Sequence, residues 1–108
     1  MATNAKVLVV DSDLNALSRI YLALVHRNYN AEASDTVAET RERMQRLKPA
    51  VLIIGEAAYL QLNERFKIPV IVLMENESSE LVDDAELRIV EKSIPLDMLI
   101  QLIEELVV

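Results

Sequence analysis

The stretch Lys6-Val7-Leu8-Val9-Val10-Asp11-Ser12-Asp13 decides the fold. Its first part is a continuous apolar run rich in β-branched residues, which is typical of a strand buried on both faces. Its last three residues carry side-chain oxygens of the kind that cap the start of a helix. Apolar residues then recur at helical spacing, at Leu14, Leu17, Ile20, Tyr21, Leu24 and Val25. The segment therefore predicts a buried strand that leads directly into an amphipathic helix.

The same alternation of strand and helix continues along the chain. Further strands are expected at residues 31–33, 51–54, 70–73 and 87–90, the first of them weak. A second helix capped by Ser34 or Asp35 ends before Pro49, a short helix covers 57–66, and a last helix begins near Pro95. Buried strands that alternate with amphipathic helices predict a parallel sheet covered on both faces. We therefore expect one domain, residues 1–108, with a doubly wound five-stranded sheet in a three-layer α/β sandwich.

Composition excludes several classes of function. The chain has 108 residues, a net charge of −7, one glycine and no cysteine. Without cysteine there is neither a disulfide framework nor a thiolate metal site, and with a single glycine no glycine-rich loop cradles a phosphate. The acidic balance argues against direct binding to nucleic acid. No apolar run approaches the length of a membrane span, so we expect a cytoplasmic protein with no cofactor and no membrane contact.

Ligands of doubly wound folds bind at the carboxyl ends of the strands. The candidate ligand-binding residues are therefore Asp11 to Asp13, Gly55 with Glu56, Met74 with Glu75, and Lys92.

Four segments, taken in order, resemble the receiver domain of two-component response regulators (CheY-like domains). Lys6 to Asp13 is similar to the first strand and acidic turn, and Lys48 to Ile54 to the approach to the phosphorylated strand. Ile68 to Leu73 is similar to the fourth strand, and Glu91 to Ile94 to the lysine turn. The resemblance spans nearly the whole chain and implies the flavodoxin-like sheet order of that family.

The resemblance also implies which functional positions are lost. The family uses two adjacent acids for Mg²⁺, an aspartate as phosphoryl acceptor, a Thr or Ser and a lysine for the phosphoryl oxygens, and a reporting aromatic residue. The corresponding residues here are Asp11, Ser12, Gly55, Met74, Lys92 and Ile89. Glycine has no carboxylate to form an acyl phosphate, and Mg²⁺ prefers several hard oxygen ligands. We therefore expect a pseudo-receiver with no catalytic residue and no metal site.

Three side chains have both a functional and a structural interpretation. Glu56 is either a displaced acceptor or a solvated loop glutamate, and Asp13 is either a metal ligand or a charge in the first turn of a helix. Lys92 either pairs with Asp11 as an internal ion pair or is an exposed relic. The vestigial pocket therefore comprises Asp11, Ser12, Asp13, Gly55, Met74 and Lys92.

The expected function is contact with another protein, without phosphorylation. The polar segment 75–84 is shorter than the family's fourth helix and has only Leu81 and Val82 as aliphatic residues. Shortening of this helix leaves apolar neighbours exposed, and exposed apolar patches mark contacts. The expected interaction surface is Leu81, Val82, Ile89 and Leu96, used for a signalling protein, an output domain or a second copy of the chain. The alternatives are a receiver phosphorylated on a displaced acid and the N-terminal regulatory domain of a transcriptional regulator.

Overall fold

The computed structural model describes residues 5–74 and 87–107. The described elements are β1 (Lys6–Val10), α1 (Leu14–His26), β2 (Asn30–Ser34), α2 (Val37–Leu47), β3 (Val51–Gly55), α3 (Glu56–Leu62), β4 (Val70–Met74), β5 (Leu87–Glu91) and α4 (Leu96–Val107). Strand and helix alternate up to β4, as the sequence predicts. The helix named α4 is the expected last helix. The expected short fourth helix falls at residues 75–86, outside the described residues, together with Leu81 and Val82.

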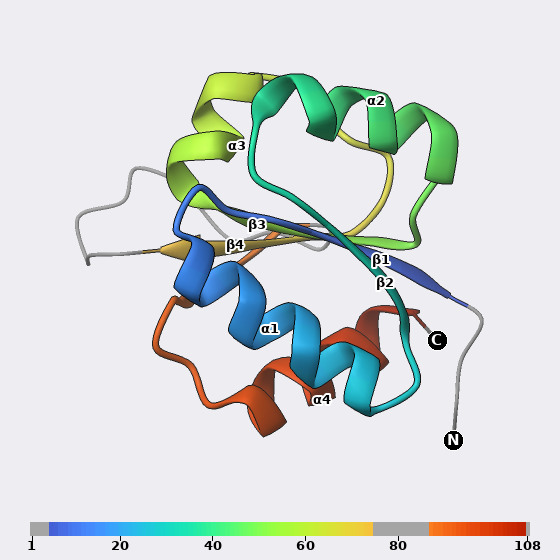
Figure 1. Cartoon of the computed structure of the whole chain (residues 1–108), viewed down its shortest axis with the longest axis vertical. Helices are drawn as coiled ribbons and strands as arrows, with labels where there is room; N and C mark the ends of the chain where they lie inside the picture. Colours follow the sequence, from blue (N-terminus) through green and yellow to red (C-terminus); the bar gives the residue numbers. More distant parts are fainter. Residues whose placement is uncertain (1–4, 75–86, 108) are drawn as a thin grey trace.

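The five strands form one parallel sheet in the order β2-β1-β3-β4-β5. Figure 1 shows the sheet between two helical layers, with α2 and α3 on one side and α1 and α4 on the other. The register pairs Val10 with Ile54, and Gly55 with Leu73. This confirms the doubly wound parallel α/β sandwich. It also brings the carboxyl ends of β1, β3 and β4 to one edge of the sheet.

Two apolar cores fill the space between the layers, because side chains of a strand alternate between its faces. Val7, Val9 and Ile53 point toward α1 and α4, and they pack with Ile20 and Ile103. Leu8, Val10, Leu52, Ile54 and Val72 point toward α2 and α3. Apart from Lys6 at the start of β1, the central strands are therefore apolar at every position, because both of their faces are buried.

Local side-chain chemistry sets the helix ends, and here two expectations were wrong. The cap of α2 is Thr36, whose side chain accepts the N–H of Glu39, rather than Ser34 or Asp35. Ser34 is buried at the end of β2 and its hydroxyl pairs with that of Thr40 at 3.0 Å. Helix α3 begins at Glu56 and ends at Leu62, not at 57 and 66, because Asn63 adopts a left-handed conformation at φ 49°.

Helices α1 and α4 are neighbours on the same face of the sheet (Figure 1). Arg27 at the end of α1 forms an ion pair with Asp97 in the first turn of α4. Tyr29 lies near Glu104. Burial of the Tyr29 phenol and, to a smaller extent, the charge of the Glu104 carboxylate raise the pKa of the phenol above its ordinary value of 10.0.

Within residues 5–74 and 87–107, no helix combines the length and apolar character needed to cross a bilayer.

Candidate functional site

Asp11 is the central residue of the candidate site. It follows the last residue of β1 and is only 3% exposed. Its Oδ1 accepts the N–H of Asp13 at 2.9 Å, and its Oδ2 lies 2.9 Å from Nζ of Lys92. No hydrogen bond from elsewhere in the described part of the chain reaches Oδ2. A buried carboxylate without a positive partner is costly, so the ammonium of Lys92 is what makes the burial of Asp11 tolerable.

Lys92 reaches Asp11 from the other end of the sequence. It directly follows β5, and its backbone N–H donates to the carbonyl of Met74 at 2.8 Å, which extends the pairing of β4 with β5 by one residue. Its side chain is 16% exposed and also lies 4.0 Å from Oδ2 of Asp13. The predicted Asp11–Lys92 ion pair is therefore confirmed, and the alternative of an exposed relic is wrong.

The carboxylate of Asp11 lies close to the backbone of Gly55. A Cβ atom at position 55 would lie 3.1 Å from Cγ, Oδ1 and Oδ2 of Asp11, closer than ordinary van der Waals contact. The backbone does not require glycine there, because φ of −63° and ψ of 148° suit any residue. An added Cβ at position 55 would therefore fit only if the Asp11 carboxylate moved by a few tenths of an ångström. The carboxylate of Asp11 lies next to the position where the side chain of an acceptor would begin.

The other acids have structural roles. Asp13 caps α1, since its Oδ1 accepts the N–H groups of Asn15 and Ala16 at 3.1 and 3.4 Å. Glu56 is half-buried and opens α3 directly after β3, so the expectation that it lies in a loop was wrong. A carboxylate in the first turn of a helix is stabilised by the helix dipole.

The remaining predicted pocket residues are present at this edge but add no ligand for a phosphoryl group. Ser12 is exposed, and Met74 is half-buried at the end of β4. A thioether is at most a weak hydrogen-bond acceptor and donates nothing to a phosphoryl oxygen.

The residues present do not fit the Mg²⁺ that the family resemblance implies. Asp11 is the one carboxylate kept from the family's set, and the ammonium of Lys92 lies 2.9 Å from its Oδ2. Mg²⁺ requires near-ideal octahedral geometry with oxygen ligands, and a lysine ammonium beside the one retained carboxylate supplies positive charge and no oxygen ligand. Across the described part of the chain, His, Asp and Glu side chains form no group of three suited to holding a metal ion.

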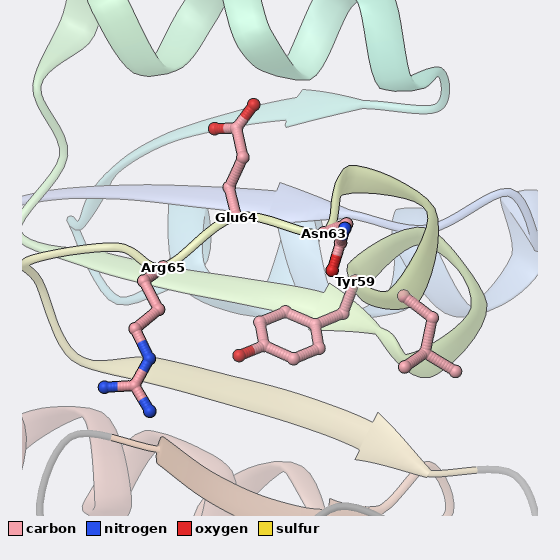
Figure 2. A pocket seen from close by; sticks show the side chains of 5 residues that line it. Tyr59, Asn63, Glu64 and Arg65 are labelled. Atoms are coloured by element: carbon pink, nitrogen blue, oxygen red, sulfur yellow. The ribbon is translucent and has the colours of Figure 1, made fainter.

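A separate pocket of about 240 Å³ lies at the end of α3, lined by Tyr59, Leu60, Asn63, Glu64 and Arg65. Figure 2 shows Glu64 pointing toward α2, where Arg41 binds it at 3.0 Å, while Tyr59 and Arg65 lie over β4. Sequence reasoning did not find this pocket. Leu60, Glu64 and Arg65 are exposed. The pocket is an open surface hollow with no buried polar group aimed into it, so it assigns no chemistry.

The expected interaction surface is not one face. Ile89 on β5 packs with the core under α2 and α3, whereas Leu96 at the start of α4 packs with the core under α1. Both side chains are half-buried. Their positions on opposite faces of the sheet follow from the connection of β5 to α4 around the sheet edge.

No family model and no curated protein matches the chain. Among solved structures, the chain is similar to the signal receiver domain of a putative LuxO repressor protein from Vibrio parahaemolyticus, with 18% identity, a TM-score of 0.78, and coverage of 97% of this chain and 91% of that one. A response regulator from Desulfuromonas acetoxidans gives 18% identity, a TM-score of 0.78 and 94% coverage of each chain. A CheY-like receiver domain from Methylobacillus flagellatus gives 14% identity, a TM-score of 0.75, and coverage of 96% and 99%. The chain therefore has the CheY-like receiver fold.

Proposed function

We propose that this chain is a pseudo-receiver, a signalling domain of receiver fold that acts by protein contact and without phosphorylation. The observation that carries the proposal is the geometry at the carboxyl edge of the sheet. Gly55 supplies no acceptor carboxylate, and the Asp11 carboxylate lies 3.1 Å from where a Cβ at position 55 would be and is paired with Lys92. Position 55 offers no carboxylate at this edge, while the described residues keep the five-stranded sheet of the fold.

The Asp11–Lys92 pair also supports a fixed rather than a switching state. In receivers, as the family resemblance implies, the lysine binds the incoming phosphoryl oxygens. Here its ammonium is bound to a carboxylate of the same chain at 2.9 Å. The loops after β1 and β5 are held together by that contact. We infer that the partner recognises one permanent conformation of the domain in the cytoplasm.

The proposed contact region is the edge formed by β5 and the start of α4. β5 is the last strand of the sheet, and it presents the exposed side chains of Arg88 and Glu91 beside the half-buried Ile89. A half-buried apolar residue flanked by exposed charges resembles the core and rim of a protein interface. An output domain or a signalling protein is the proposed partner.

Affinity capture tests this function. The immobilised protein should retain the same partner from an extract of its source cells before and after treatment with acetyl phosphate and Mg²⁺. Arg88→Glu should lower the recovery, because reversing a charge at an interface rim slows association and adds repulsion. Arg46→Glu, at an exposed arginine on α2 that pairs with Glu32 of β2 at the opposite edge of the sheet, is the matched control and should change nothing. A partner retained only after phosphodonor treatment would contradict the proposal.

A further inference from the structure

Exposed apolar side chains gather on the helical layer formed by α1 and α4. Among the described residues, five large hydrophobic side chains are strongly exposed, and four belong to this layer. Leu14, Leu22 and Val25 on α1 are 59%, 62% and 44% exposed, and Met98 on α4 is 57% exposed. On α1 the three residues follow helical spacing and lie opposite the buried Ala16, Leu17, Ile20 and Leu24, so they form one outward stripe. An apolar stripe of this kind marks a contact.

The charges of the same two helices are separated by sign. Helix α1 contains no acidic residue and carries exposed Arg19 and His26. Helix α4 contains no basic residue and carries exposed Glu104 and Glu105, while its Asp97 pairs with Arg27 of the same copy. This segregation contrasts with α2, where acidic and basic residues alternate and pair with each other. The layer therefore presents a basic apolar helix beside an acidic apolar helix.

We propose that this layer is the interface of a homodimer, with α1 of one copy packed against α4 of the other. Two-fold symmetry makes such an interface self-complementary, since each contact occurs twice. Pairing α1 with the partner's α1 would bring basic residues together, and pairing α4 with α4 would bring acidic residues together. Only the crossed arrangement places opposite charges around the apolar stripes. It also allows association of a chain whose net charge is −7, which otherwise favours repulsion.

The area suits a weak dimer. Covering four exposed side chains from each copy, at about 100 Å² apiece, removes about 800 Å² of apolar surface from water. With the polar groups around them, the total buried area comes near the lower limit of about 1,200 Å² for a standard interface. We therefore expect a monomer–dimer equilibrium at micromolar concentration. The inference goes beyond the proposed function, because it assigns a second copy to α1 and α4 and leaves the β5 edge for a different protein.

Light scattering across micromolar concentrations tests the stripe. The mass of the unchanged protein should rise toward that of a dimer, and Leu22→Glu should keep it monomeric. Leu60→Glu is the matched control, because Leu60 is a leucine of similar exposure, 57%, on α3 in the opposite layer. That variant should dimerise like the unchanged protein. A protein that stays monomeric throughout, or a Leu60→Glu variant that loses dimerisation as fully as Leu22→Glu, would overturn the proposal.

A charge exchange tests the crossed arrangement and does not depend on Leu22. Arg19→Glu alone and Glu105→Arg alone should each weaken the dimer, whereas an equimolar mixture of the two variants should form heterodimers in which both contacts pair opposite charges. Arg19 also donates to the carbonyl of Lys92 at 3.0 Å, and loss of that bond persists in the mixture, so it cannot produce the recovery. Failure of the mixture to recover would overturn the crossed arrangement. Arg88→Glu should leave the mass unchanged, which separates this test from that of the proposed function.

Discussion

Replacing Lys92 with methionine is expected to lower the free energy of unfolding by about 3–5 kcal/mol, the usual cost of breaking a buried ion pair by removing one partner. Asp11 is 3% exposed, and the Lys92 ammonium at 2.9 Å is the cation that compensates its charge. Methionine keeps much of the length and the apolar stem of lysine, so the packing of the stem changes little. Urea denaturation measures the loss as a lower midpoint at an unchanged slope.

Two further variants isolate the ion pair. Lys67→Met removes an exposed lysine and should change the free energy of unfolding by less than about 0.5 kcal/mol. Adding Asp11→Asn to Lys92→Met removes the uncompensated charge, so the double variant should be more stable than Lys92→Met alone. An equal or larger loss in the double variant would mean that the contact of the two side chains is not what stabilises this edge of the sheet.

Adding a side chain at position 55 should destabilise the fold. In Gly55→Ala the new Cβ would lie 3.1 Å from three atoms of Asp11, which is held in place by Lys92 and by the N–H of Asp13. Overpacking of this kind costs about 1–3 kcal/mol, more than the about 0.4–1 kcal/mol gained when glycine is replaced in a compatible conformation. Chemical denaturation should show a net loss.

The same substitution in an Asp11→Ala background provides the control. The three atoms that crowd the new Cβ are then absent, and Gly55→Ala should become neutral or stabilising. Gly55→Asp should be worse than Gly55→Ala, because it adds a second carboxylate against Asp11. It is also expected to fail to restore phosphorylation, because Lys92 is paired with Asp11 and Met74 stands at the Thr/Ser position. A Gly55→Ala variant more stable than the unchanged protein would show that Asp11 does not occupy this space.

The central strands could be predicted because residues such as Leu8 and Ile53 are buried whichever face they occupy. The Asp11–Lys92 contact was predictable as well, since both residues directly follow strands of one parallel sheet and so lie at the same edge of it. The crowding at Gly55 was not, because it depends on the register that places Val10 beside Ile54 and on the rotamer of Asp11. Nor was the placement of Ile89 and Leu96 on opposite faces, because short, partly exposed segments show too little periodicity to assign a face.

The residue that caps the start of α2 could not be predicted from the sequence either. Ser34, Asp35 and Thr36 are all acceptable helix caps by residue type. The choice of Thr36 follows from the length of β2, which buries Ser34 and lets its hydroxyl bind Thr40. Strand lengths depend on pairing with distant segments, so local sequence leaves such boundaries open.

Intact-mass spectrometry after incubation with acetyl phosphate and Mg²⁺ tests the central claim most directly. The mass of the unchanged protein should stay the same, because Gly55 offers no carboxylate and Asp11 is bound to Lys92. The Glu56→Gln and Asp13→Asn variants should behave identically. A stable mass increase of one phosphoryl group would contradict the claim, and its loss in one of these two variants would identify the acid that accepts it.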